Sequence, residues 1–133
     1  MEARDMEITV GMKGTAETSV EREDTAYEVG SGELLVYATP CMVALMEGAA
    51  CDAIKDAIPE GKTSVGTMLN ISHVAATPVG MDVRAEAEVT EVDGNTVTFQ
   101  ITAYDEAGKI GEGTHKRAVI TSQKFLDKVY AKL

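Results

Sequence analysis

The chain has 133 residues, of which 44% are hydrophobic and 26% charged, and it contains no low-complexity tract. A chain of this length can bury a core of its own without disulfides or metals, so we expect a single domain spanning residues 1–133. The formal net charge of −10 repels phosphate backbones and anionic lipid surfaces, which weighs against binding to nucleic acids or membranes.

The N-terminus and the cysteines indicate a cytoplasmic protein. Residues 1–10 have neither a cationic start nor a long apolar run, so no signal peptide is visible. The longest apolar stretch, residues 40–51, is interrupted by a glutamate and is too short to span a bilayer. Cys41 and Cys51 lie about 15 Å apart along one expected helix, too far for a disulfide, and suit a reducing compartment.

The N-terminal quarter predicts one strand and a loop. Residues 6–20 mix β-branched residues with charges and glycine, which favours a strand. Residues 21–33 are polar and end in Gly-Ser-Gly, which is typical of a loop. We expect a short extended piece at residues 34–37.

A helix start follows at Thr39, a good N-cap residue, with Pro40 at the first helical position. The next eleven residues are apolar on nearly every side, which predicts a buried helix. Charges return only from Asp52, and residues 59–61 end the helix. The small residues 48–50 would allow a curved sheet to approach the helix closely.

After this helix the hydrophobic period changes to two. Residues 63–76 predict a strand, and from residue 81 apolar and polar side chains alternate. Turn sequences at residues 93–95 and 105–108 separate two further strands from a last one at residues 109–121. We therefore expect four strands in a meander with one apolar face, followed by a short amphipathic helix at residues 122–133.

This order predicts an α+β hotdog fold, in which a curved antiparallel sheet wraps around one long central helix. An exposed edge strand in such a sheet promotes association unless it is paired. We therefore expect at least a homodimer whose sheets join edge to edge.

Glu47 is the most informative residue for chemistry, because it lies in the middle of the apolar helix. Burial of a carboxylate without a partner costs on the order of several kcal/mol, so Glu47 should be paired or have a raised pKa. It either pairs with a distant arginine or caps a backbone group, or it acts as a general base or orients water or a histidine.

His73 and Thr39 each have a structural explanation beside a functional one. His73 lies in an otherwise apolar, β-branched strand, where it is either structural or faces the helix glutamate; His115 we expect to be structural. Thr39 is explained by capping, although a helix N-terminus also favours negative charge such as an oxyanion. The sequence lacks metal-ligand spacing and the GxSxG, P-loop and GxGxxG motifs.

From about Thr25 to Ile120 the sequence resembles the hotdog thioesterases of the fluoroacetyl-CoA thioesterase-like group. The resemblance rests on several short segments taken together: Val29-Gly30-Ser31-Gly32, Ala38-Thr39-Pro40, Leu45-Met46-Glu47-Gly48-Ala49-Ala50, Ser64-Val65-Gly66-Thr67, Ile71-Ser72-His73-Val74-Ala75-Ala76-Thr77-Pro78-Val79-Gly80 and Gly111-Glu112-Gly113-Thr114-His115-Lys116-Arg117.

The resemblance implies an acyl-CoA thioesterase that releases free acid and CoA from a small or medium acyl thioester. It implies Thr39, Glu47 and His73 as the catalytic set, Gly66 close to the thioester and Arg117 as a second substrate-binding residue. Coenzyme A would enter as part of the substrate, with no separate cofactor and no metal.

One segment differs from the fluoroacetyl-specific member, which carries aromatic side chains as a lid before the helix. Residues 32–37 contain no phenylalanine here, so the resemblance implies an acyl thioester as the substrate but does not specify its acyl group. The carrier, CoA or acyl carrier protein, stays open. So do a non-catalytic acyl-CoA sensor and an enoyl-CoA hydratase or dehydratase on the same fold.

Helix geometry limits how the three residues could cooperate. Thr39 and Glu47 are about 12 Å apart along the helix axis, so they cannot touch directly. A single site would need a bridging residue or water, or contributions from two chains of a symmetric dimer. Whether Thr39 or water attacks the thioester is not determined by the sequence.

Overall fold

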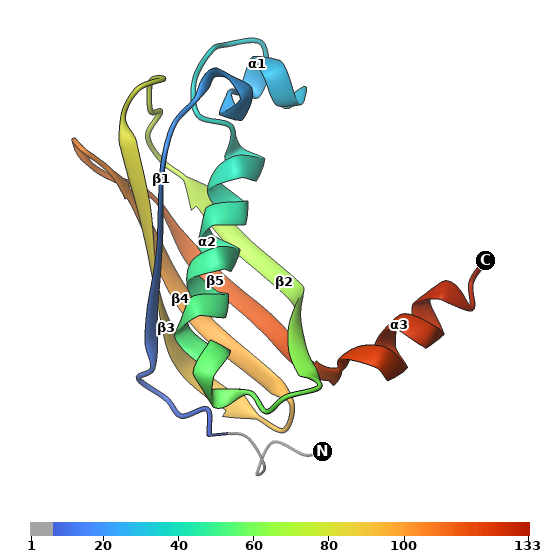
Figure 1. Ribbon diagram of the computed structural model, residues 1–133. Coiled ribbons are helices and arrows are strands. Elements are labelled where there is room, and N and C mark those ends of the chain that lie inside the picture. The colour runs from blue at the N-terminus through green and yellow to red at the C-terminus, as the bar shows by residue number, and fades with distance from the viewer. Residues whose placement is uncertain (1–6) are drawn as a thin grey trace.

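A curved five-stranded antiparallel sheet packs against helix α2 (Thr39–Ile54) in the computed structural model, which describes residues 7–133 (Figure 1). This arrangement confirms the expected α+β architecture. The strands are β1 (Lys13–Ser19), β2 (Lys62–His73), β3 (Asp82–Asp93), β4 (Thr96–Asp105) and β5 (Gly108–Thr121).

The sheet order is β1-β3-β4-β5-β2, so the expected four-strand meander is wrong for one strand. Strands β3 to β5 do form a meander, but β2 pairs with β5 and lies at the far edge. The chain after β2 bonds to the segment before α2, where Tyr37 N donates to Thr77 O, and then reaches β3 beside β1. Alternating hydrophobicity predicts strands but does not say which strands pair.

The N-terminal quarter holds less strand and more helix than predicted. Strand β1 covers only Lys13–Ser19, and Met6, the first residue of the predicted strand, lies outside the described residues. The predicted loop contains the short helices η2 (Arg22–Asp24) and α1 (Ala26–Val29). The expected extended piece forms isolated bridges from Val36 and Tyr37.

Both the cap and the first helical residue of α2 lie one position earlier than the sequence predicts. Ala38 is the N-cap, and Thr39 is already the first helical residue. No side chain makes a capping hydrogen bond there, so the hydroxyl of Thr39 is available to another partner. The helix ends at Ile54 and continues as the 3-10 turn η3 (Lys55–Ala57).

Helix α2 is also less buried than its composition predicts, because one face is left open. Its core face packs mainly on β1 and β3. A Cβ atom at Gly14 of β1 would overlap the helix backbone at Ala49 and Ala53, so this glycine permits the close approach. Ala44 and Gly48 are exposed, as is Thr39 at the start of the helix. The fully buried helix residues are Met42, Met46, Ala49, Ala50 and Ile54.

Two parts of the molecule extend beyond the helix–sheet core (Figure 1). Strand β2 is an edge strand with Leu69 exposed near its middle. Helix α3 (Ser122–Tyr130), predicted for residues 122–133, projects away from the sheet and has no buried residue. Among residues 7–133, no helix is long and apolar enough to cross a membrane.

Candidate active site

The first functional cluster joins the start of α2 to the end of β2. Thr39 Oγ1 lies 2.7 Å from His73 Nδ1, which is a hydrogen bond in either tautomer of the imidazole. The two residues are 34 positions apart in the chain. Thr39 reaches His73 because it is the first helical residue and its hydroxyl is not used for capping.

A pocket of about 270 Å³ opens beside this pair. Its walls come from α1, from the segment before α2 and from the chain that follows β2. Tyr37 lines it, and its hydroxyl donates to the carbonyl of Cys41 at 3.2 Å. Burial raises the pKa of Tyr37, so the phenol stays protonated and serves as a wall of the pocket.

The environment of His73 keeps its imidazole neutral near pH 7. Burial lowers its pKa below the ordinary value of 6.5, while a backbone contact with Ala75 acts in the opposite direction. Nε2 is buried and has no hydrogen-bond partner among residues 7–133. A buried unpaired nitrogen costs about 1–3 kcal/mol, which favours a water, a substrate or a second chain as its partner.

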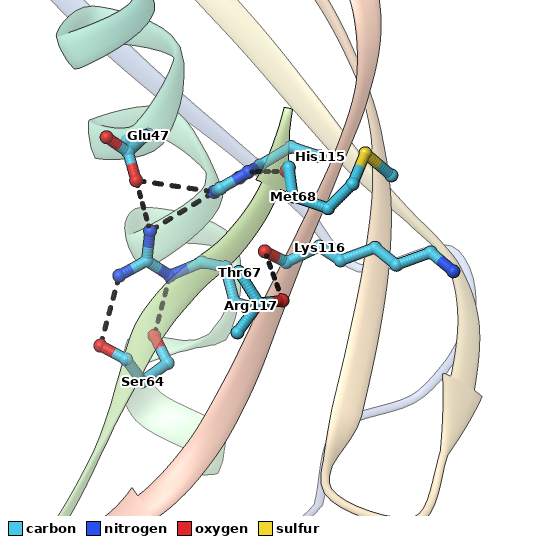
Figure 2. A network of polar contacts seen from close by, with 7 residues as sticks. All are labelled: Glu47, Ser64, Thr67, Met68, His115, Lys116 and Arg117. Carbon is cyan, nitrogen blue, oxygen red and sulfur yellow. Dashed lines mark hydrogen bonds and ion pairs between the residues drawn. The ribbon is translucent and has the colours of Figure 1, made fainter. Parts of the chain in front are cut away.

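The second cluster surrounds Glu47, two turns further along α2 (Figure 2). Glu47 Oε2 lies 3.0 Å from Arg117 Nη1 and 3.7 Å from His115 Nε2. Its side chain is 37% exposed, so the expectation of full burial is wrong. Pairing with a distant arginine, one of the alternatives that the sequence left open, is observed as a contact with Arg117.

Arg117 is held on three sides (Figure 2). Its Nε donates to Ser64 Oγ at 2.8 Å and its Nη2 to Ser64 O at 3.0 Å, while Nη1 contacts both Glu47 and His115. The side chain is 8% exposed. The guanidinium therefore fixes the Glu47 carboxylate in place and neutralises its charge.

His115 is also part of this network, and the structural role expected from the sequence stays a prediction. It is fully buried, and its Nδ1 lies 2.9 Å from Met68 O. A carbonyl accepts, so Nδ1 carries the proton and Nε2 accepts from Arg117 at 3.1 Å. Burial lowers the pKa of His115, and the Arg117 charge lowers it further. The alternation of His115 and Arg117 on one strand face was the sequence signal for this proximity.

Gly66 makes room for the carboxylate of Glu47. A Cβ atom at this position would lie 2.5 Å from Glu47 Oε2 and 3.2 Å from His115 Cε1. The register of β2 against β5 shifts between Gly66 and Met68, which leaves Thr67 as an extra residue. Such bulges re-aim side chains beside functional sites. Here the bulge brings the glycine backbone under the glutamate.

The described chain thus contains two centres rather than one. It brings Thr39 and His73 together, and it gathers Glu47, Gly66 and Arg117 about 12 Å away along the helix axis. The catalytic and substrate-binding roles of these five residues stay predictions.

Neither metal binding nor thiol chemistry has a visible centre in this region. No group of three or more His, Cys, Asp and Glu within residues 7–133 is placed to hold a metal. Cys41 and Cys51 are free and half-buried. Burial raises the pKa of the Cys41 thiol, which keeps the thiol protonated.

Comparisons with known proteins identify the family of this chain. The family model described as fluoroacetyl-CoA-specific thioesterase matches residues 20–123. The fluoroacetyl-CoA thioesterase of Streptantibioticus cattleyicolor is 42% identical over 97 residues, which cover 73% of this chain and 70% of that protein.

Solved structures give the same result. A structure of the fluoroacetyl-CoA thioesterase superposes with a TM-score of 0.88 at 36% identity, covering 95% of this chain and 98% of that one. A thioesterase superfamily member from Thermus thermophilus has a TM-score of 0.85 at 31% identity, covering 94% and 92%. A hot-dog-like protein from Thermanaerovibrio acidaminovorans, 24% identical, shares the fold with a TM-score of 0.85 over 95% and 93%. The chain has the hotdog fold and belongs to the fluoroacetyl-CoA-specific thioesterase family.

Proposed function

We propose that this protein hydrolyses small or medium acyl-CoA thioesters to free acid and CoA. The observation that carries the proposal is the 2.7 Å contact between Thr39 Oγ1 and His73 Nδ1 beside a pocket of about 270 Å³. A hydroxyl in contact with a neutral imidazole is the arrangement that activates an oxygen nucleophile. Membership of a thioesterase family supports the same conclusion.

The chemistry follows from these positions. His73 takes a proton from the Thr39 hydroxyl, or from a water at that place, as the oxygen attacks the thioester carbonyl. The positive end of the α2 dipole favours the resulting oxyanion. The C–S bond then breaks and the proton passes to the departing CoA sulfur. Where Thr39 is the nucleophile, water releases the acid from the acyl-threonine in a second round.

We infer further that Glu47 reaches this centre from a second copy of the chain. Strand β2 is an edge with Leu69 exposed near its middle. A two-fold axis near Leu69 would pair β2 with its copy in antiparallel register and place His73 opposite the partner subunit's Val65. The partner subunit's Glu47, which stands over its own Gly66, would then approach the unpaired Nε2 of His73.

The substrate range follows from the pocket rather than from the family name. Residues 32–37 contain no phenylalanine, so no pair of aromatic rings closes over the acyl group from that segment. We therefore expect turnover of several short acyl-CoA thioesters rather than strict selectivity for fluoroacetyl-CoA.

The free, half-buried cysteines support a reducing, cytoplasmic setting.

An acyl-CoA panel with a colorimetric thiol reagent tests the activity. Thiol release from one or more chain lengths, at well above the rate without enzyme, is the expected result. Tight binding of acyl-CoA without thiol release would instead indicate a sensor. Loss of enoyl absorbance without thiol release would indicate a hydratase.

Mixed dimers test the shared site. Chains carrying His73→Ala and chains carrying Glu47→Gln are each expected to be inactive alone. A heterodimer of the two has one site with both residues intact if Glu47 acts across the interface, and activity returns. If Glu47 served its own chain, every site would lack one residue and mixing would restore nothing.

A further inference from the structure

A groove of about 510 Å³ lies where α3 leaves the sheet. Its lining includes Lys62, Lys124 and Lys128, together with Asn95 and Phe125, and it contains no acidic residue. The chain as a whole has a net charge of −10 from 22 acidic and 12 basic residues. Lys124 and Lys128 in a groove whose lining holds no carboxylate are therefore a local reversal of the sign of the surface, which favours an anionic ligand.

The two helix lysines form a pair that faces the groove. Lys124 and Lys128 are four residues apart on α3, which places them on the same face one turn apart. No hydrogen bond or ion pair joins either ammonium to another described residue. The helix is tied to the body at its start, because Ser122 N donates to Gly61 O at 3.0 Å. The lysines are thus presented on an anchored helix.

The groove is continuous with the strand pair that holds the Glu47 network. Lys62 is the first residue of β2 and pairs with Thr121, the last residue of β5. Gly66, which stands under Glu47, follows on the same strand about 13 Å away. In the dimer proposed above, this Gly66 lies beside the partner subunit's His73, so the groove serves the partner subunit's reactive centre. The extended pantetheine arm of CoA can bridge a distance of this order between the thioester there and a phosphate in the groove.

We propose that this groove binds the nucleotide phosphates of the CoA substrate, with Lys124 and Lys128 as the phosphate-binding residues. The inference rests on the proposed function and adds to it the part of the substrate that the groove recognises. Ammonium groups suit phosphates as point charges, and Phe125 offers an aromatic ring on which the adenine can stack. The site thereby selects acyl-CoA over thioesters that lack the nucleotide.

The test compares two substrates with the same acyl group, an acyl-CoA and the corresponding acyl-pantetheine. In Lys124→Glu/Lys128→Glu we expect KM for acyl-CoA to rise about tenfold at low salt, with kcat unchanged, because the charges act on binding alone. Hydrolysis of acyl-pantetheine should not change. The rise in KM should shrink as ionic strength increases. Lys13→Glu on β1 reverses an exposed charge far from the groove and should affect neither substrate.

A second readout separates this inference from the proposed function. Binding of CoA itself, measured by calorimetry, should weaken in the double variant. In competition with dephospho-CoA, the binding of CoA to the double variant should persist only at higher CoA concentration. If CoA binding depends on the lysines but no thioester is hydrolysed, the groove proposal stands and the proposed thioesterase function is overturned. Equal KM changes for both substrates, unchanged CoA binding, or an effect confined to acyl carrier protein thioesters would overturn the groove. Lys124→Gln/Lys128→Gln repeats the test without introducing negative charge.

Discussion

The start and the middle of α2 each lie beside a histidine, but the two histidines differ in how completely their hydrogen bonds are satisfied. At its start, Thr39 and His73 form one short contact, and His73 Nε2 has no partner among the described residues. Two turns later, the guanidinium of Arg117 makes four polar contacts, one to Glu47, one to His115 and two to Ser64. The first centre has an unused hydrogen-bonding atom, while the second is nearly saturated.

This difference separates reactive from positioning roles. A proton-transferring group must exchange partners during the reaction, so a site with a free nitrogen can do chemistry. A saturated network resists movement and is suited to holding a charge in a fixed place. Two histidines in one small protein therefore have different expected roles, although burial lowers the pKa of both.

The largest expected effect comes from the reactive centre. His73→Ala removes the base, and we expect kcat/KM to fall by about 10²–10⁴-fold. Stability should change by less than about 1 kcal/mol, because His73 lies at the end of an edge strand and is only half-buried. Steady-state kinetics with urea denaturation on the same preparation checks both values. If the loss of activity only followed a loss of folded protein, His73 would not have a reactive role distinct from the positioning role of His115.

Arg117→Ala should cause a large loss of stability, which His73→Ala should not. It leaves Glu47, His115 and Ser64 without their shared partner in a mostly buried place. We expect a loss of about 2–3 kcal/mol, less than for a fully buried pair because water reaches Glu47. Urea denaturation measures the loss. Arg117→Lys keeps the charge but not the fork, and should recover only part of the stability.

The sequence predicted the elements of this comparison better than their contacts. The change from an apolar helix to period-two strands identified α2, β3, β4 and β5 close to their observed bounds. It could not show that β2 crosses to pair with β5, because pairing depends on contacts distant in the chain. For the same reason, the pairing of Glu47 with Arg117, 70 residues later, was open until the fold was known.

The Thr39 hydroxyl shows a second limit. Capping explained this residue completely at the level of sequence, yet the cap lies one position earlier, at Ala38. A shift of one residue at a helix start is within the ordinary uncertainty of sequence-based boundaries. That single residue decides whether the hydroxyl bonds to its own helix or to His73.

Gly66→Ala tests how strictly the second centre is positioned. The new methyl group would lie 2.5 Å from Glu47 Oε2 and must displace the carboxylate. We expect kcat to fall by about tenfold, since small misplacements of a catalytic group are costly, while stability changes by less than about 1 kcal/mol. Thr67→Ala, next in the chain, is the matched control, because its hydroxyl bonds to Lys116 O away from Glu47. Equal effects of the two changes would indicate a general disturbance of the bulge.

The smallest expected effect is a pH dependence that divides between the two histidines. Hydrolysis needs neutral His73, whose pKa is below 6.5, so kcat/KM should decline with a midpoint below pH 6.5 as the solution is acidified. Both histidines bind protons more weakly when folded than when unfolded. Their contribution to stability is therefore present above pH 6.5 and is lost as pH falls below it. His115→Gln should flatten the pH dependence of stability and leave the midpoint of kcat/KM in place, whereas a shifted midpoint would mean that His115 takes part in the proton transfer.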